Sequence, residues 1–483
     1  MAAIEELKEH SRELTNLGTI SGLLGWGQEV MMPEEGINAR KQQLRVLSGL
    51  QHDMITSEKL ANILDSIEPG KLDEEDFSVY REVSRDHERA SQIPRDLQQD
   101  ISEKSSETVK IWQKAKEEND FETVRPHLEE LVELKRQYAK EIDDTREPYE
   151  VLFEGFEPYI PFEDVVKVMD KLGSELPELL EKVEKGQENI FETECSEENQ
   201  EEALRRIVKD LGFDFDRGRL DVSKHPFTSG NQFDARITTR FNENDISEGL
   251  MAGIHEFGHA LYELGLPQDK YGLPTGKSRD LVVHESQSRL WENHIGRSKE
   301  FWEHTAPILE EKLGLEASPE EYFNSVNRVK EESLIRVYAD EISYHLHIVL
   351  RFELGRKLVN GDLEVEDLPE AWNNRMEELL GVRPENDAEG CLQDIHWMQG
   401  MFGYFPTYSL GTVLSAQIYN QLEEEIENID EKISNGEFEE IRSWLKENIH
   451  SKGCIMKTED LIDEVVGGLD PEEFVNYLEN KYE

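Results

Sequence analysis

The feature that most constrains this chain is the spacing of its apolar residues. Over long segments they recur at i, i+3 and i+4, which is the pattern of amphipathic helices. The clearest of these segments are 4–24, 107–142, 162–183, 319–358 and 410–433. Strand patterns are rare, and the best is FDARITTRF at 233–241, which alternates and contains β-branched residues. The sequence therefore predicts a mainly α-helical protein with one small β-sheet.

The length of the chain favours more than one packed lobe. Its 483 residues exceed the size, about 250–300 residues, at which a single hydrophobic core usually stops growing. Residues 1–145 are predicted to form an all-helical, highly charged N-terminal lobe, and residues 146–483 contain nearly all of the unusual residue clusters. We expect the two parts to pack as one integrated unit.

The charge of the chain excludes several classes of partner. The formal net charge is −53, and the acidic residues are spread along the whole sequence. Such a surface repels nucleic acid and anionic membranes. The sequence also has no run of the roughly 18 apolar residues that a membrane span needs. Neither nucleic acid nor a membrane is expected as a partner.

Three explanations of the charge compete. Intrinsic disorder is opposed by the regular apolar periodicity and by seven tryptophans. A specific basic partner is the second explanation. The third, which we favour, is adaptation to high salt, because screening weakens the self-repulsion of the surface. The sequence thus predicts a moderately halophilic protein.

The cysteines and the N-terminus favour the cytoplasm. Cys195, Cys391 and Cys454 lie far apart and form no C-x-x-C pair, which fits a reducing compartment. The N-terminal stretch MAAIEELKEHSREL is charged and has no apolar signal core. We therefore expect a cytoplasmic protein without a secretion signal.

One predicted helix carries a pattern typical of metal sites. His255 and His259 stand at i and i+4, so on a helix both imidazoles can point to one ion. Glu256 is rotated away from them and can reach a water at that ion as a general base without being a ligand. Two ordinary histidines on a partly buried helix are the competing explanation of this pattern alone.

A third ligand separates these two explanations. Glu285 lies near the start of a second amphipathic segment, VHESQSR. A glutamate from a neighbouring helix completes a two-His, one-Glu site with an open fourth position, which is a catalytic zinc arrangement. Glu263 shares the helix face of the histidines but lies too far along the axis to join both easily. His284 is placed behind the ligands, where it could fix the tautomer of one of them.

Six short blocks follow one another along the chain. They are His225-Pro226-Phe227, Asp234-x-Arg236-x-Thr238, His255-Glu256-x-x-His259, His284-Glu285-Ser286-Gln287, Ile335-Arg336-x-x-Ala339-Asp340 and Gly390-x-x-Gln393-Asp394-x-His396-Trp397. In this order they resemble the thermostable carboxypeptidase 1 (Taq-type) family of metal-dependent carboxypeptidases. The resemblance covers most of the chain from about residue 145 onward. Nearer the N-terminus, LLGWGQEVMMP at 23–33 resembles the family's L-L-x-W-D-x-x-T-x-M-P, but Gly27 and Val30 stand where Asp and Thr are usual.

The resemblance implies a fold and a reaction. The fold would be a saddle-like, two-lobed helical shell around a deep groove, with the N-terminal lobe covering the groove and the small sheet beside the metal-binding helix. The protein would be a homodimer that removes single residues, with broad specificity, from peptides with a free C-terminus. It would use one zinc ion per chain, or cobalt in its place, held by His255, His259 and Glu285.

A carboxypeptidase must also hold the terminal carboxylate of its substrate, and Arg suits this better than Lys. We assign this role to Arg336, which we expect on a long helix four residues before Asp340. A plain Arg336–Asp340 ion pair on one helix face is the competing explanation. Asp340 and Asp394 are placed behind the site, where Asp340 could orient Arg336 or a ligand histidine.

Hydrolysis further needs a hydrogen-bond donor at the oxygen on which charge develops. His396, Tyr404 and Tyr408 are the candidates, with core packing as the alternative explanation for each tyrosine. His225 could line the groove or brace the sheet.

Two other functions stay open from the sequence. An endo-oligopeptidase or a dipeptidyl carboxypeptidase on the same scaffold would have the same metal site and would differ at the closed end of the groove and at Arg336. A non-enzymatic acidic helical scaffold is opposed by the joint presence of His255, Glu256, His259 and Glu285.

Overall fold

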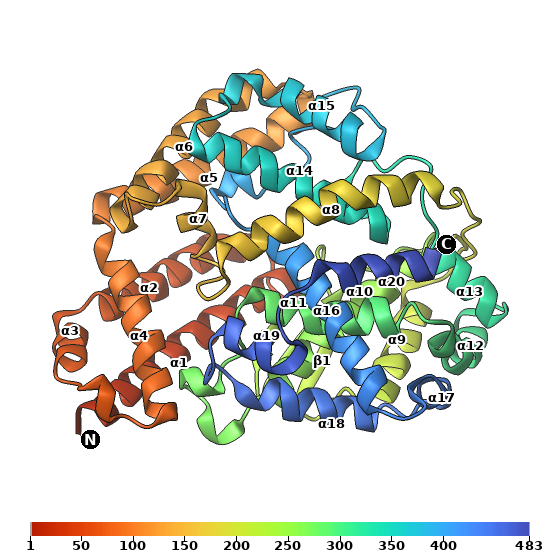
Figure 1. The fold of residues 1–483 in the computed structure, drawn as a ribbon, viewed down its shortest axis with the longest axis horizontal. Helices are drawn as coiled ribbons and strands as arrows, with labels where there is room; N and C mark the ends of the chain where they lie inside the picture. The colour runs from red at the N-terminus through yellow and green to blue at the C-terminus, as the bar shows by residue number, and fades with distance from the viewer. Residues whose placement is uncertain (1, 483) are drawn as a thin grey trace.

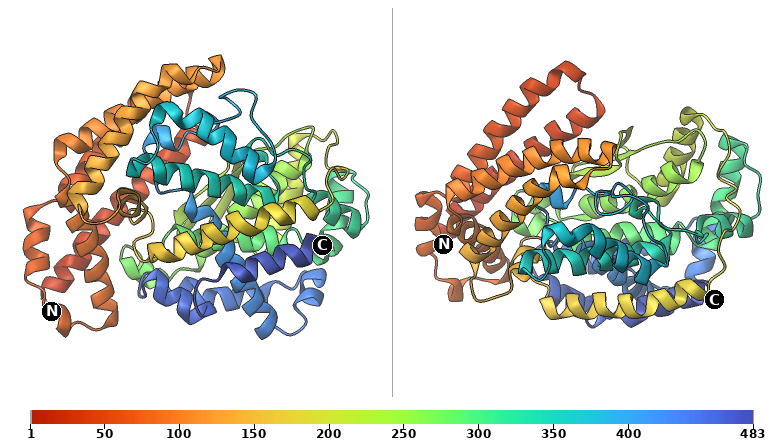
Figure 2. Two further views of the ribbon diagram at one scale, coloured as in Figure 1. Left: turned by 45° about the horizontal axis from the view of Figure 1, so that its top comes forward. Right: turned by 90° about the horizontal axis from the view of Figure 1, so that it is seen from above.

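The computed structural model describes residues 2–482. Within this range the chain forms twenty α-helices, short 3-10 turns and one three-stranded sheet, and Figures 1 and 2 show the arrangement. The predicted mainly α fold with one small sheet is confirmed. Across residues 2–482 no helix has the length and apolar character needed to cross a membrane.

The first six helices gather on one side of the molecule, drawn from red to orange in Figures 1 and 2. They are α1 (Ala2–Val30), α2 (Ile37–Ile55), α3 (Glu58–Asp65), α4 (Glu74–Gln92), α5 (Arg95–Glu118) and α6 (Phe121–Ile142). A small hydrophobic cluster joins α1, α3 and α4, whereas α5 and α6 pack into the main core of the molecule. The division of the chain at residue 145 stays a prediction.

The predicted helix over 107–142 is wrong in one respect, because it is two helices. Asn119 ends α5 with a φ of 56°, a left-handed conformation that asparagine tolerates better than most residues. The chain then turns at Asp120 and α6 begins at Phe121. The two helices pack side by side as an antiparallel pair.

The remaining helices surround two central ones, α10 (Ile246–Gly265) and α11 (Leu281–Arg289). They are α7 (Pro148–Phe153), α8 (Phe162–Lys182), α9 (Glu197–Leu211), α12 (Lys299–Leu313), α13 (Pro319–Val326), α14 (Glu341–Asn360), α15 (Leu368–Leu380), α16 (Pro406–Glu425), α17 (Ile429–Asn435), α18 (Glu439–Asn448), α19 (Thr458–Val466) and α20 (Pro471–Tyr482). The predicted segment 410–433 is therefore divided between α16 and α17. Helix α11 packs against both α10 and α16, so it lies inside the body of the molecule.

The sheet lies against α10, as predicted. Its strands are β1 (Gly218–Val222), β2 (Phe227–Asn231) and β3 (Asp234–Thr239), in the spatial order β1-β3-β2. β1 runs parallel to β3 and β2 runs antiparallel to it. The inward side chains of β3, such as Ala235 and Ile237, are buried and face the helix. β2 therefore forms one edge of the sheet beside the helix that carries the His-Glu-x-x-His motif.

The predicted helix over 319–358 is broken in its middle. α13 ends at Val326 and α14 begins only at Glu341, and the residues between them cross the molecule in an irregular path. Tertiary hydrogen bonds replace the helical ladder there. Gly186 donates its backbone N–H to the Val329 carbonyl at 3.0 Å, and Gln393 binds the Leu334 carbonyl and the Arg336 N–H. Arg336 consequently lies in a short 3-10 turn rather than on a long helix.

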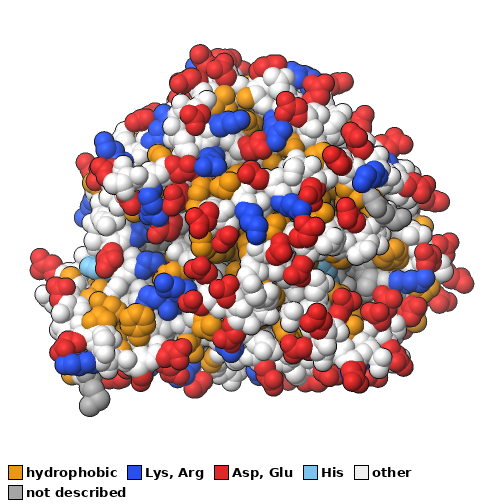
Figure 3. All heavy atoms as spheres, viewed as in Figure 1, with side chains coloured by type: hydrophobic (Ala, Val, Ile, Leu, Met, Phe, Trp, Pro, Cys, Tyr) orange, Lys and Arg blue, Asp and Glu red, His pale blue; other side chains and the backbone are white. Residues whose placement is uncertain are grey.

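Acidic side chains cover the visible surface, as the charge of the chain requires. Figure 3 shows Asp and Glu scattered over the whole face, with Lys and Arg between them. Many of these cations form ion pairs one helical turn away, for example Arg125 with Glu122 at 3.0 Å and with Glu129 at 2.7 Å. Exposed pairs of this kind contribute little to stability.

Candidate metal centre

The three predicted metal ligands lie together. His255 and His259 project from one face of α10, and Glu285 projects toward them from α11. The Glu285 Oε2 atom is 3.6 Å from His255 Nε2 and 3.4 Å from His259 Nε2. The ligand atoms of all three residues lie within 4.8 Å of one another. The two-helix geometry that the sequence predicted is therefore present.

Two glycines allow α11 to approach its neighbours this closely. A Cβ atom on Gly258, inside the motif itself, would lie 2.6 Å from the Gln287 carbonyl oxygen and from Ser288 Cα. A Cβ atom on Gly411 of α16 would lie 2.6 Å from the Cβ of Glu285. Side chains at these positions would push α11 away from α10 and α16. The glycines thus fix the distance at which Glu285 faces the histidines.

The donor set fits a divalent metal ion such as zinc. A tetrahedral zinc site with bonds of about 2.0–2.1 Å separates its ligand atoms by about 3.4 Å, close to the observed spacings. Burial lowers the pKa of His259 to about 3, so its ring is neutral and able to coordinate. Burial opposes ionisation of Glu285, but Arg289 and His255 hold its pKa below the ordinary value, so it is a carboxylate.

Both ligand histidines have a partner at the ring nitrogen that faces away from the ligand cluster. His255 Nδ1 is 2.9 Å from Oε2 of Glu292, and His259 Nδ1 is 2.6 Å from Nδ1 of His284. His284 in turn contacts Glu263 Oε1 through Nε2 at 3.0 Å. Such contacts orient a ligand histidine and set its tautomer. The predicted position of His284 is therefore consistent with the geometry.

Glu292 was not predicted from the sequence. It lies in η5 (Leu290–Ile295), a π-helical turn that continues α11, and such turns often occur at functional sites. One signal could have identified it, because Glu292 follows Glu285 by seven residues and so returns to the same side of the helix. Arg289 lies between them and donates to Glu285 Oε1 at 2.8 Å and to Glu292 Oε2 at 3.1 Å. This arginine holds both carboxylates in place.

Glu256, the predicted general base, is oriented by the edge of the sheet. Its side chain lies beside the ligand cluster, and its Oε2 accepts a hydrogen bond from the Thr228 hydroxyl at 2.6 Å. Thr228 belongs to the edge strand β2, so the sheet orients this carboxylate. Burial raises the pKa of Glu256 above its ordinary value, which brings a carboxylate closer to the basicity that proton transfer needs.

Arg336 is held by Asp394 and not by Asp340. Its Nη2 is 2.7 Å from Asp394 Oδ1, and its Nη1 contacts only the Tyr344 hydroxyl, at 3.3 Å, among the hydrogen bonds described for residues 2–482. Asp340 instead caps α14, where its Oδ1 accepts the Ser343 N–H at 2.9 Å. The predicted Arg336–Asp340 helix pair is wrong because the helix is broken between them. Asp394 also pairs with buried Arg351, and the two arginines keep the pKa of this buried carboxyl well below its ordinary range.

The predicted donors form one aromatic cluster around Arg336. The His396 and Tyr404 rings stack at 5.6 Å, and Arg336 lies 5.6 Å from the centre of the Tyr408 ring. Burial lowers the pKa of His396 to about 4, so its ring is neutral. Burial raises the pKa of Tyr404 and Tyr408, and Tyr344 and the Glu285 carboxylate act in the same direction, so both hydroxyls keep their protons.

Two cavities open along α10. One, of about 1100 Å³, is lined at His255 and Glu256 and extends to the loop after Arg336. Its other lining residues include His225, Arg289, Glu292, Val337, Tyr338, Asp340 and Tyr344. The other cavity, of about 880 Å³, reaches Glu263, two helical turns further along α10, and lies between β2 and the helices α1 and α2. Both cavities are called the groove below, and His255 of the ligand cluster and His225 line the first of them.

Comparisons with known proteins agree over the whole chain. A sequence profile described as carboxypeptidase Taq (M32) metallopeptidase matches residues 6–482. Thermostable carboxypeptidase 1 of Pyrococcus furiosus is 38% identical over 490 residues, which cover 99% of this chain and 98% of the relative. Carboxypeptidase 1 of Bacillus subtilis is 32% identical, with 98% and 96% covered. A solved structure described as Pyrococcus furiosus carboxypeptidase apo-Mg has a TM-score of 0.96 at 37% identity and covers 100% of this chain and 99% of that chain. The similarity includes α1–α6, where the sequence blocks were weakest.

Proposed function

Because the chain belongs to the carboxypeptidase Taq (M32) family of metallopeptidases, we propose that it removes single amino acids, with broad specificity, from the C-termini of peptides. The observation that carries this proposal is the spacing of His255, His259 and Glu285 beside a groove that His255 and Glu256 line. The ligand types favour one zinc ion per chain, with cobalt as a substitute.

The metal ion, when bound, would activate a water molecule and polarise the carbonyl of the last peptide bond. Glu256 is the group of this chain that takes the proton from that water and returns it to the leaving amine. The hydroxyl of Thr228 occupies one carboxylate oxygen of Glu256 and leaves the other free for the proton. Glu292 and His284 keep the rings of His255 and His259 in the orientation that coordination needs.

Arg336 is our candidate for binding the substrate's terminal carboxylate. Asp394 binds the Nε and Nη2 atoms of Arg336. This ion pair fixes the orientation of the guanidinium group, and with it the direction of Nη1. The rings of Tyr344, Phe405 and Tyr408 surround the guanidinium and limit its movement. Preorganised donors of this kind bind an anion without a large loss of side-chain entropy. Tyr404, Tyr408 and His396 are the candidates for the hydrogen bond to the developing oxyanion.

Digestion of matched peptides tests the proposal. Purified protein, with its metal content measured by mass spectrometry, is incubated with one peptide in its free-acid and its C-terminally amidated form. Stepwise loss of single residues from the free acid, and no release from the amide, is the expected result. Equal cleavage of both peptides would identify an endo-oligopeptidase, release of dipeptides would identify a dipeptidyl carboxypeptidase, and no cleavage by metal-loaded protein would favour a non-enzymatic scaffold.

We further propose a cytoplasmic homodimer whose stability increases with salt. The net charge of −53 supports the salt dependence, because self-repulsion falls as ionic strength rises. Light scattering measures the oligomeric state, and unfolding curves in low and high KCl measure the salt effect. A monomer at assay concentration would contradict the first proposal, and full stability at low salt would contradict the second.

A further inference from the structure

The helix that carries Glu285 needs a cap that its own sequence does not provide. Helix α11 has nine residues, and the backbone N–H groups of its first turn have no carbonyl within the helix to bond. The His284 N–H donates to the Asp280 carbonyl at 3.1 Å, which is the first hydrogen bond of the helix. The N–H groups of residues 281–283 therefore need acceptors from outside the helix. Asp280 stands at the N-cap position, where an aspartate usually accepts one of these N–H groups. Its side chain makes no such bond within the described chain.

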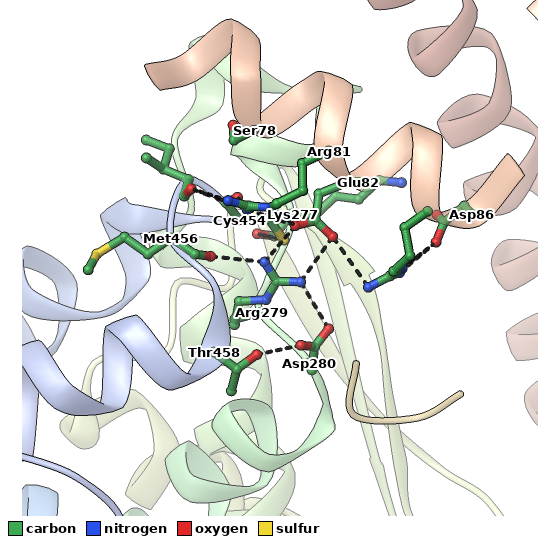
Figure 4. A network of polar contacts seen from close by, with 12 residues as sticks. Ser78, Arg81, Glu82, Asp86, Lys277, Arg279, Asp280, Cys454, Met456 and Thr458 are labelled. Atoms are coloured by element: carbon green, nitrogen blue, oxygen red, sulfur yellow. Dashed lines mark hydrogen bonds and ion pairs between the residues drawn. The ribbon is translucent and has the colours of Figure 1, made fainter. Parts of the chain in front are cut away.

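Asp280 is engaged in a different contact. Its Oδ1 accepts from Arg279 Nη2 at 3.1 Å, and its Oδ2 accepts from the Thr458 hydroxyl at 2.5 Å. Figure 4 shows both bonds and shows Arg279 at the centre of the network. Arg279, which is 2% exposed, also donates to both carboxylate oxygens of Glu82 on α4. The contact between the N-terminal helices and the body thus draws the Asp280 carboxylate away from the end of α11.

Glu157 supplies the missing acceptor from a distant part of the sequence. It lies in the loop after α7, and its Oε1 accepts the Val282 N–H at 2.7 Å. Its side chain is fully buried, and its Oε2 finds no hydrogen-bond partner among residues 2–482. Burial, and then the nearby Asp280 carboxylate, raise the pKa of Glu157 well above its ordinary value.

We propose that Glu157 is a positioning residue for the metal site, because it caps α11 and thereby fixes where Glu285 and His284 lie relative to the histidines of α10. Val282, which Glu157 holds, precedes Glu285 by three residues, which is less than one helical turn. The backbone of α11 has little freedom to compensate, since Gly258 and Gly411 let neighbouring helices contact it on two sides. Loss of the cap would loosen the first turn and move the Glu285 carboxylate relative to the histidines. This inference rests on the metal site of the proposed function and adds a residue outside the groove to it.

Three variants separate the hydrogen bond from the volume of the side chain. Glu157→Gln keeps an acceptor of the same length, Glu157→Leu fills a similar volume without an acceptor, and Glu154→Leu is a control in the same loop that does not contact α11. The protein is stripped of metal and titrated with Co²⁺ against a competing chelator, and its visible absorption bands are recorded. Melting temperatures are measured for all forms.

We expect Glu157→Gln and Glu154→Leu to bind Co²⁺ within about twofold of the unmodified protein. Glu157→Leu should bind about 10- to 100-fold more weakly, the effect typical of residues that support metal ligands, and its absorption bands should change. Unchanged affinity and bands in Glu157→Leu would overturn the proposal, as would an equal loss in Glu157→Gln. If Glu157→Leu does not fold, Glu157→Asp replaces it, since its carboxyl group is one methylene too short to reach Val282, and unaltered affinity there would be equally contradictory. The readout uses no peptide, so failure of the proposed peptidase activity leaves this test intact.

Discussion

The metal centre and the hairpin of α1 and α2 are built in opposite ways. At the metal centre the side chains that support the ligands, Arg289, Glu292 and His284, each have two or more partners. The hairpin, defined here as residues 14–55, is loosely attached, and none of the described residues of α2 is buried. Several of its large apolar side chains are exposed, namely Ile20, Leu23, Met31, Val46 and Leu50. Local stability must therefore differ strongly between these two regions.

The attachment of the hairpin is concentrated at a few contacts. Trp26 near the end of α1 is 5% exposed and lies against the sheet, with Arg236 at 4.2 Å and Arg219 at 4.8 Å from its ring centre. Near the other end, the hydroxyls of Ser11 and Thr15 donate to the Gly272 carbonyl. Arg236, in the sequence block Asp234-x-Arg236-x-Thr238, thus contacts the hairpin and not the metal ligands. A region held so sparsely above the groove can open locally while the centre stays rigid.

The largest expected effect is at the metal centre. Glu256→Gln should reduce kcat about 10³-fold, because a positioned general base typically contributes 10²- to 10⁴-fold. Metal content should stay the same, since Glu256 is not among the ligands. Steady-state kinetics and metal analysis check this. Activity within tenfold of the unmodified protein would assign the proton transfer to another group. It would also show that the fixed side chains of the metal centre matter less for function than their many contacts suggest.

Glu82→Gln tests the contact between α4, in the N-terminal part of the chain, and the body of the molecule. Removing one partner of a buried ion pair costs about 3 kcal/mol or more, so the free energy of unfolding should fall by that amount at pH 7. Burial opposes ionisation of Glu82, but its interactions with Arg279, Arg85 and Arg81 together outweigh burial and lower the pKa. A lowered carboxyl pKa stabilises the fold above the unfolded value, about 4.3, and this contribution is lost as the pH falls through the folded value.

The difference between Glu82→Gln and the unmodified protein should consequently shrink on acidification below about pH 4.3. Urea unfolding at pH 7 and pH 4 measures it. A constant difference across this range would show that the Glu82 charge does not contribute. Metal affinity should not change, because the metal ligands lie outside this network.

Arg336→Lys should raise KM for free-acid peptides about 10- to 100-fold, with a smaller change in kcat. The lysine keeps the charge but cannot hold Asp394 and a carboxylate through separate edges of one planar group. Asp394→Asn is the matched variant, since it releases Arg336 without removing it. Kinetics on free-acid and amidated peptides measure the discrimination. An unaltered KM in both variants would place carboxylate binding elsewhere in the groove.

Local signals made the ligands predictable, and long-range contacts made their surroundings unpredictable. His255 and His259 are one turn apart, so the sequence shows them directly. Arg336 and Asp394 are 58 residues apart, and no spacing rule connects them. Residues 327–335 contain no proline or glycine from which the break in the predicted helix could have been predicted. Hydrogen bonds with Gly186, Gln187 and Gln393 decide their path, and these partners become neighbours only after folding.

The smallest effects are expected in the hairpin. Trp26→Ala removes two cation–π contacts worth about 0.5–1 kcal/mol each at partly exposed sites, and it also removes the ring from the sheet. Amide hydrogen exchange in residues 14–55 should accelerate several-fold, while exchange in α10 and α11 should not. Uniform acceleration across the chain would show that the hairpin and the metal centre unfold together, and the contrast between them would be lost.

A matched change should act in the opposite direction. Gly27 stands where the family pattern usually has Asp, and a Cβ atom there would lie 3.7 Å from Arg40 Nη1 on the facing helix. Gly27→Asp adds a carboxylate within reach of Arg40 and removes a glycine from the interior of α1, each worth a few tenths of a kcal/mol. Exchange in the hairpin should slow, and the slowing should diminish in high salt because the new pair is only half-buried. If Trp26→Ala and Gly27→Asp shift hairpin exchange in opposite directions and both leave α10 unchanged, the hairpin is an independently opening cover of the groove.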